Sequence, residues 1–217
     1  MFQRIRTQLA IRCDTRSILN TIDHSKFRAI MPQFQDSPYG KSKYWDLKKR
    51  MVIAVKHARQ LRLEKAHRQS ILDLGTGCGY FPYVCRHYGH DAVGVDVSVP
   101  MYREICSLLG LEWHEHRIEP KKRLPSFDRR FDLVTGLLVF FNHPRENQLW
   151  GVDEWRFFLK DLAEYHLSSN GSAYFKLVKN IHGNYYDQDL TQFFTDHGAT
   201  LNAGAVHFPS LDAFRQG

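Results

Sequence analysis

One short segment, with glycines at three alternate positions, constrains the fold of this chain more than any other. Residues 71–81 read ILDLGTGCGYF. An apolar run that ends in glycines predicts a β-strand and a tight turn, and the helical spacing of the residues that follow predicts a helix. Glycine adopts positive φ easily and lets a ligand approach the backbone, and a helix start offers free N–H groups to a carboxylate or phosphate. The segment therefore predicts a strand–loop–helix unit with a ligand site at the loop.

Strands and helices alternate after this segment. Apolar runs predict further strands at residues 92–97, 111–118, 131–139 and 172–178, and residues 199–208 predict a last strand or a small hairpin. Repeated β-α-β units predict an α/β fold, a three-layer αβα sandwich with a mainly parallel sheet. Such sheets bind ligands beyond the carboxyl ends of their strands. We therefore expect the glycine loop, Asp96 and residues 135–143 around one crevice.

The N-terminal part of the chain has a different pattern. Residues 1–40 contain the breakers Pro32, Pro38 and Gly40, and we interpret them as irregular. The first 20 residues carry four arginines and one acid, which favours a basic N-terminal helix or tail over an organellar transit peptide. From Asp46 a basic amphipathic helix is predicted, ending near His67. Its apolar face consists of Leu47, Met51, Ala54, Val55, Ala58 and Leu61.

Composition narrows the classes of protein to which this chain can belong. The chain has 217 residues and a formal charge of +7, which favours polyanionic partners without identifying one. No apolar run reaches the roughly 18 residues that a membrane span needs. The four cysteines form no CxxC pair, and no His/Cys pair has zinc spacing, so we expect a cytoplasmic protein without a metal site. Nothing in the sequence indicates the oligomeric state.

The glycine spacing separates two classes of cofactor site. Dinucleotide-binding loops have the pattern GxGxxG, but Tyr80 occupies the third glycine position here. The observed pattern is DxGxGxG, beginning at Asp73. A second strand ends in Asp96, 23 residues after Asp73, and residues 130–136 read RFDLVTG. Together these motifs resemble those of the class I S-adenosylmethionine-dependent methyltransferases, and the resemblance extends from about Ser70 to Phe208.

The resemblance implies a Rossmann-like methyltransferase fold with a seven-stranded or shortened sheet, an N-terminal helical segment, and S-adenosylmethionine as cofactor. It divides the chain into an N-terminal segment, residues 1–45, which could cover the active site, and a methyltransferase domain, residues 46–217. Asp73 and the loop would face the methionine part, Asp96 the ribose and Val97 the adenine. Arg117 or Ile118 stands where the family often has an acid. The implied cofactor residues are Asp73, Gly75, Thr76, Gly77, Gly79, Asp96, Val97, Arg117, Ile118 and Thr135.

Methyl transfer to a hydroxyl needs a base, and His143 is the candidate because histidine titrates in the useful range. The alternative is a solvated loop histidine. Candidate substrate-binding residues are Tyr39, Tyr44, Asn142 and Glu154. The alternatives are that the aromatic residues pack the basic helix onto the sheet, and that Glu154 is a charge at a helix N-terminus.

Four functions remain open on the sequence. The favoured hypothesis is O-methylation of a small molecule or saccharide, because residues 135–138 lack the N/D-P-P-Y/F motif of enzymes that act on bases and amides. The alternatives are an RNA or protein methyltransferase that uses the basic helix, and a non-catalytic cofactor-binding protein. An NAD-dependent oxidoreductase is disfavoured by Tyr80.

Overall fold

The computed structural model describes residues 2–36, 44–139, 141, 150–180 and 182–215. Its strands form a seven-stranded sheet in the order β3-β2-β1-β4-β5-β7-β6. The pairs β2–β3, β1–β4 and β4–β5 are parallel, whereas β7 is antiparallel to both β5 and β6. The expected α/β fold with a mainly parallel sheet is confirmed. The chain divides into two compact units, which are described separately: Met1–Arg68 with Thr76–Glu115, and Gln69–Gly75 with His116–Gly217.

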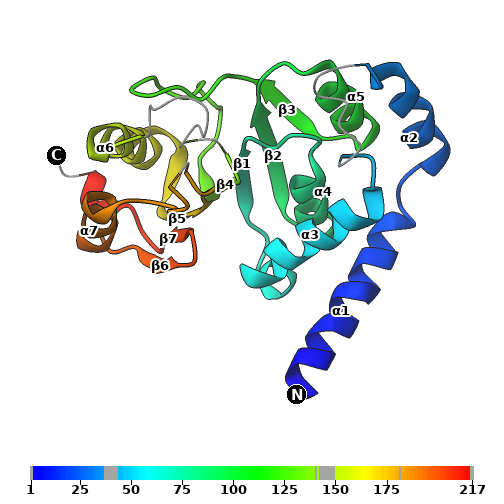
Figure 1. Cartoon of the computed structure of the whole chain (residues 1–217), viewed down its shortest axis with the longest axis horizontal. Helices are drawn as coiled ribbons and strands as arrows, with labels where there is room; N and C mark the ends of the chain where they lie inside the picture. The colour runs from blue at the N-terminus through cyan, green and yellow to red at the C-terminus, as the bar shows by residue number, and fades with distance from the viewer. Residues whose placement is uncertain (1, 37–43, 140, 142–149, 181, 216–217) are drawn as a thin grey trace. The chain divides into compact units, whose positions relative to one another are not determined.

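The first unit contains five α-helices and two strands in its described part. They are α1 (Phe2–Leu19), α2 (His24–Ile30), α3 (Leu47–Gln60), α4 (Tyr80–His87), β2 (Asp91–Asp96), α5 (Pro100–Leu108) and β3 (Glu112–Glu115), with short 3-10 turns at Met31–Phe34 and Leu63–Lys65. Helix α3 packs against both α1 and α4, and α4 packs against β2 (Figure 1). The prediction of an irregular segment at residues 1–40 is therefore wrong: α1, α2 and a 3-10 turn occupy residues 2–34.

Polar contacts over long sequence distances attach α1 to the rest of the first unit. The Asp14 carboxylate accepts a hydrogen bond from Arg59 Nε at 2.7 Å, and another from the Tyr88 hydroxyl. Ile18, one turn further along, is completely buried. Tertiary packing thus supports a helix whose own sequence has no strong apolar stripe.

Helix α3 is shorter than the sequence predicted. It begins at the N-cap Asp46, whose carboxylate accepts the backbone N–H of Lys49 at 2.9 Å, and it ends at Gln60 rather than near His67. Arg62 adopts a left-handed conformation with φ of 58°, which stops the helix. The predicted apolar face is buried, except for its last member, Leu61.

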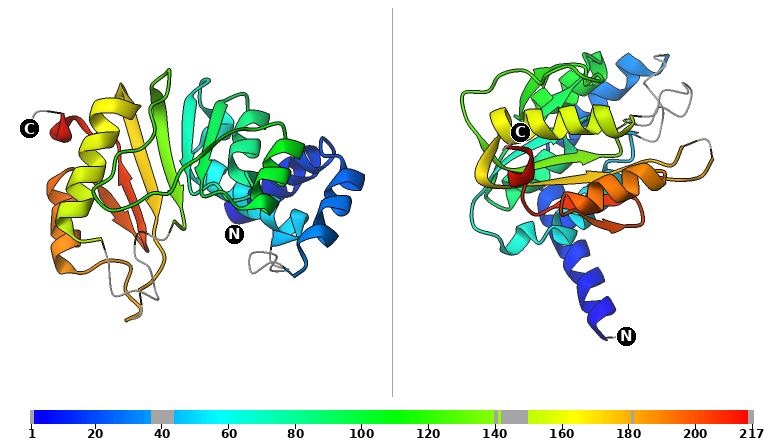
Figure 2. Two further views of the ribbon diagram at one scale, coloured as in Figure 1. Left: turned by 90° about the horizontal axis from the view of Figure 1, so that it is seen from above. Right: turned by 90° about the vertical axis from the view of Figure 1, so that its left-hand side faces the viewer.

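The second unit contains β1 (Ser70–Leu74), β4 (Phe131–Leu137), α6 (Val152–Asp161), β5 (Leu167–Lys176), α7 (Gln188–Asp196), β6 (Thr200–Asn202) and β7 (Ala205–Phe208). A π-helical turn, Leu162–His166, joins α6 to β5, and a 3-10 turn, Asp212–Phe214, follows β7. Trp155 of α6 is fully buried and lies 5.3 Å from Phe175 of β5 and 5.2 Å from Phe194 of α7, measured between ring centroids. Helices α6 and α7 therefore share one face of this part of the sheet (Figure 2).

The predicted strands are present, with shifted ends. Strand β5 begins at Leu167, five residues earlier than predicted, because the preceding helix ends in the π-helical turn. Strand β4 stops at Leu137, since Leu138 has a φ of 63°. Strand β3 covers only four residues of the run predicted at 111–118. Residues 199–208 form the hairpin that was one of the two options.

None of the described helices is both long and apolar enough to cross a membrane.

Candidate cofactor site

The glycine loop follows β1 and leads into α4. Gly75, Gly77 and Gly79 have φ angles of 67°, 58° and 74°, in the left-handed region that favours glycine. The backbone N–H of Thr76 donates to Val95 O at 3.1 Å, and Gly79 N–H donates to Thr76 O at 3.0 Å. Gly79 is the N-cap residue of α4 and has no side chain to cap the helix. The loop therefore turns tightly at the start of the helix, as predicted.

The three glycines meet different surroundings. A Cβ atom on Gly79 would lie 2.3 Å from Leu111 Cδ1, and one on Gly75 would lie 2.5 Å from Val139 Cγ2. A Cβ on Gly77 would meet no atom within 4 Å. Gly75 and Gly79 are thus required by packing, whereas Gly77 exposes its backbone to open space. Such a place suits a ligand that approaches the main chain closely.

Asp96 ends β2 and is hydrogen-bonded to the loop. Its Oδ2 accepts the backbone N–H of Gly77 at 2.6 Å, and its Oδ1 accepts the N–H of Val97 at 2.7 Å. Burial raises the pKa of this carboxyl above its usual value, although the two backbone hydrogen bonds act in the opposite direction. A carboxylate has about four acceptor positions, so these two contacts leave capacity for the hydroxyls of a ligand.

Gly94, two residues before Asp96, belongs to the same arrangement and was not among the predicted site residues. A Cβ atom there would lie 2.7 Å from Thr76 Cγ2, so the loop packs directly on the strand. The signal was a glycine within an otherwise apolar strand, which often marks close backbone approach. Thr76 thus has a packing role at the base of the loop, in addition to any contact with a ligand.

Asp73 and Thr135 meet in the second unit. They are register partners on the parallel strands β1 and β4, and Thr135 Oγ1 donates to Asp73 Oδ1 at 2.7 Å. Both side chains are buried, with exposed fractions of 3% and 0%. A buried carboxylate needs such donors. The structure therefore brings these two predicted residues together and fixes the orientation of the Asp73 side chain.

Tyr44 lies in an aromatic cluster of the first unit. Its ring is 5.7 Å from the Tyr102 ring in an edge-to-face arrangement, and the Arg50 guanidinium lies 5.3 Å from its centroid. The Tyr80 hydroxyl, at the start of α4, donates to Tyr44 O at 3.0 Å. These contacts agree with the packing interpretation of Tyr44. Its proposed contact with a substrate stays a prediction.

Glu154 has a structural role at the start of α6. Its Oε2 accepts the backbone N–H of Gly151 at 3.0 Å, and its Oε1 lies 3.0 Å from Lys121 Nζ. Partial burial raises the pKa of this carboxyl, but the contacts with Lys121 and the backbone outweigh that effect, and the pKa lies below its usual value. The helix-charge interpretation explains these contacts, and a substrate role for Glu154 stays a prediction.

The remaining predicted residues are less defined by the structure. Val97, directly after Asp96, is partly exposed. Arg117 and Ile118 follow β3 and belong to the second unit, so their contact with adenine stays a prediction. Tyr39, Asn142 and His143 lie outside the described residues. Within the described part of the chain, no group of three or more His, Cys, Asp or Glu residues could hold a metal ion.

Comparison with known proteins gives structural similarities only. No family model matches the chain, and no curated protein matches its sequence. Solved structures do match. DesVI from Streptomyces venezuelae has a TM-score of 0.48 and 16% identity, with 75% of this chain and 61% of DesVI covered. CalS10, an amino pentose methyltransferase from Micromonospora echinaspora, has a TM-score of 0.47 and 20% identity, with 62% and 53% covered.

A SAM-dependent methyltransferase from Aquifex aeolicus is also similar, with a TM-score of 0.47 and 18% identity over 69% of this chain and 86% of that one. The chain thus spans less than two thirds of DesVI and CalS10, the first two of these structures. The order of the seven strands and the glycine loop after β1 do not depend on these weak similarities. Both features agree with what the sequence motifs predicted. On those grounds the chain has a Rossmann-like α/β fold with a glycine loop after its first strand.

Proposed function

We propose that this protein is an S-adenosylmethionine-dependent methyltransferase. The observation that carries the proposal is the contact between Asp96 Oδ2 and Gly77 N at 2.6 Å, beside a glycine with open space above its Cα. This contact positions a carboxylate next to an accessible stretch of backbone. A ribose with two neighbouring hydroxyls fits the carboxylate, and the rest of the nucleoside fits the exposed loop.

The described residues fit such a cofactor in distinct ways. Asp96 has acceptor capacity for the ribose hydroxyls, and the space on the Cβ side of Gly77 is open. Val97, partly exposed next to Asp96, offers an apolar contact for the adenine ring. The family resemblance implies that Asp73, oriented by Thr135, would face the methionine part. When bound, the cofactor supplies an electrophilic methyl group on its sulfonium sulfur.

For the acceptor, we propose a hydroxyl of a small molecule or saccharide. The support is the sequence at the end of β4, Thr135-Gly136-Leu137-Leu138, which lacks the motif associated with bases and amides. The protein would hold the acceptor in line with the methyl group and exclude water. His143, outside the described residues, stays the candidate base for removing the hydroxyl proton.

The decisive experiment is calorimetry of the purified chain with S-adenosylhomocysteine and, separately, with NAD. We expect binding of the first and none of the second. Asp96→Ala should weaken S-adenosylhomocysteine binding at least tenfold, because it removes the acceptor for the ribose; a tenfold change corresponds to about 1.4 kcal/mol.

The matched control is Glu115→Ala. Glu115 is the register partner of Asp96 at the end of the neighbouring strand β3, and its side chain is exposed. This variant should bind as the wild type does. Wild-type affinity in Asp96→Ala, or an equal loss in both variants, would contradict the ribose assignment. Binding of NAD alone would reject the methyltransferase proposal.

A further inference from the structure

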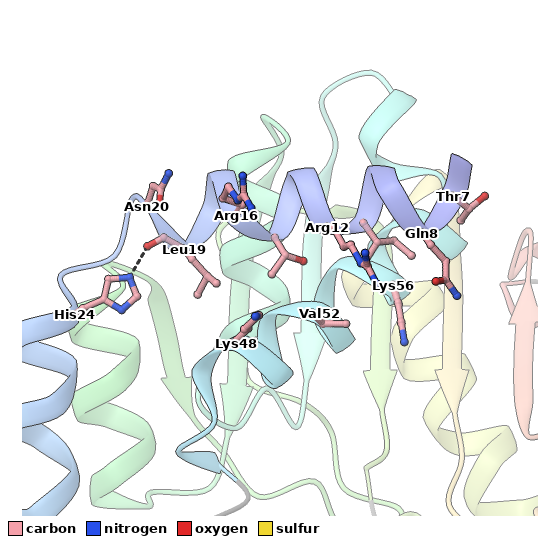
Figure 3. A pocket seen from close by; sticks show the side chains of 12 residues that line it. Thr7, Gln8, Arg12, Arg16, Leu19, Asn20, His24, Lys48, Val52 and Lys56 are labelled. Carbon is pink, nitrogen blue, oxygen red and sulfur yellow. Dashed lines mark hydrogen bonds between the residues drawn. The ribbon is translucent and has the colours of Figure 1, made fainter. Parts of the chain in front are cut away.

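A long groove separates α1 from α3 in the first unit. Its volume is about 1410 Å³. One wall is formed by nine residues between Thr7 and His24, and the other by Lys48, Val52 and Lys56 of α3. His24 closes one end, where its Nε2 lies 2.8 Å from Leu19 O at the C-terminus of α1 (Figure 3). The glycine loop contributes no residue to this groove. The groove is therefore separate from the candidate cofactor site.

The rim of the groove is basic. Arg16 and Lys48 lie toward the His24 end, and Arg12 and Lys56 lie toward the Thr7 end, as Figure 3 shows. All four side chains are exposed, and none of them forms an ion pair with a carboxylate in the described part of the chain. None of the described residues that line the groove is acidic. The four cations repel one another, and a negatively charged occupant would remove that repulsion.

The floor of the groove is mainly apolar. Ile11 and Leu19 of α1 and Val52 of α3 are all partly exposed there. Thr15, between the two α1 residues, is 3% exposed, and its hydroxyl has no hydrogen-bond partner among the described residues. A buried hydroxyl without a partner is costly. An occupant that reached it with a polar group would relieve this cost.

The lining distinguishes between anionic partners. Single-stranded nucleic acid binds on aromatic side chains that stack with its bases, and none of the residues found to line this groove is Phe, Tyr or Trp. An amphipathic helix, in contrast, places apolar residues at i, i+3, i+4 and i+7 into an apolar groove. Lys48 and Lys56 are eight residues apart on α3, about 12 Å along its axis, with Val52 between them. That spacing fits a partner helix that has an apolar stripe with acidic residues on both sides of it.

We propose that the α1–α3 groove binds an acidic amphipathic helix of a partner protein. The apolar face of that helix would contact Ile11, Leu19 and Val52, and its carboxylates would pair with Lys48 and Lys56 on one side and the α1 arginines on the other. This inference does not depend on methyl transfer, because the groove is separate from the glycine loop.

The test uses the full chain and a fluorescent 18-residue peptide with leucines at helical spacing and glutamates flanking the leucine stripe on both sides. Fluorescence anisotropy should show saturable binding that weakens as salt is added. The same peptide with lysines in place of the glutamates should not bind. Lys48→Glu/Lys56→Glu should weaken binding of the acidic peptide at least tenfold.

The matched control is Lys49→Glu/Lys65→Glu, which changes the net charge equally at exposed positions outside the groove lining. It should retain most of the affinity. Three outcomes would overturn the proposal: no binding of the acidic peptide, equal loss in both double variants, or stronger groove-dependent binding of a 20-nucleotide RNA or of phosphatidylserine vesicles. Calorimetry with S-adenosylhomocysteine on the same variants separates this result from the cofactor site, since their cofactor affinity should be unchanged.

Discussion

The glycine loop, whose residues Thr76–Gly79 belong to the first unit, and the α1–α3 groove of the same unit are built in opposite ways. In the loop, ligand-binding capacity comes from backbone: glycines at positive φ, and a carboxylate that accepts two main-chain N–H groups. In the groove, it comes from exposed side chains on two helices that are held together by packing and by Asp14. The loop should therefore tolerate almost no substitution, and the groove should tolerate many.

The largest effect is expected at Gly79. Gly79→Ala places a methyl group 2.3 Å from Leu111 Cδ1 and forces alanine to a φ of 74°. Together, overpacking and left-handed backbone should lower the free energy of unfolding by about 2–5 kcal/mol. Urea denaturation measures the loss. Gly110→Ala is the control, because Gly110 has a φ of 62° and no atom near its Cβ position; a loss as large in the control would show that packing of the loop is not the cause.

Substitution of Gly77 should weaken cofactor binding more than it lowers the stability of the protein. Gly77→Ala meets no protein atom, so only the left-handed backbone is penalised, at about 1–2 kcal/mol, as in Gly110→Ala. The added methyl group enters the space that we assign to the cofactor, and the affinity for S-adenosylhomocysteine should fall at least tenfold by calorimetry. If Gly77→Ala binds as tightly as Gly110→Ala does, the open space above Gly77 is not the cofactor site.

The pH dependence of cofactor binding should follow the protonation of the Asp96 carboxylate. Because burial raises its pKa, protonation begins at a higher pH than for an ordinary aspartate and removes a ribose acceptor. Cofactor affinity should therefore begin to fall while the pH is still above the usual aspartate pKa of about 3.9, as the pH drops from neutral toward that value. Asp96→Asn, which cannot titrate, should bind more weakly but lack this dependence.

Stability of the free protein should change in the opposite direction. A carboxyl whose pKa is raised by folding binds its proton more tightly in the folded chain, so its contribution to stability is fully present below the unfolded pKa and is lost as the pH rises through the folded pKa. Comparing wild type and Asp96→Asn by urea denaturation across the same range isolates this contribution. An acid loss of affinity that persists in Asp96→Asn would assign the titration to another group.

The same contrast explains what could be predicted from the sequence. The loop was predictable because its function needs particular residue types at fixed spacing: the glycines, and the acids Asp73 and Asp96 at strand ends. The hydrogen bond between Asp73 and Thr135 was not predicted, although both residues were, since strand register is set by pairing of β1 with β4 rather than by local sequence.

A basic N-terminal helix was one of the two options for the first 20 residues, but the bounds of α1 and the presence of α2 were not predicted, for a physical reason. Pro32, Pro38 and Gly40 mark only the end of residues 1–40, and α1 has no clear apolar stripe that would identify it. Its contacts with Arg59 and Tyr88 join residues 45 and 74 positions apart. A groove formed by such contacts leaves no motif in the sequence. The sequence offered the basic helix as a binding face for RNA or protein, but it did not show that α1 lies beside it.

The smallest effect should be found in the groove itself. Lys48→Glu/Lys56→Glu replaces exposed side chains that form no ion pair with the described carboxylates, so the free energy of unfolding should stay within about 0.5 kcal/mol of the wild type. An increase in the free energy of unfolding would be the more informative deviation, because it would mean that the lysines repel Arg12 and Arg16 strongly in the free protein. A loss of several kcal/mol would show instead that these lysines hold α3 against α1. The lysines would then be needed for packing of the two helices and would not be available to bind a partner. The contrast between the groove and the glycine loop would fail.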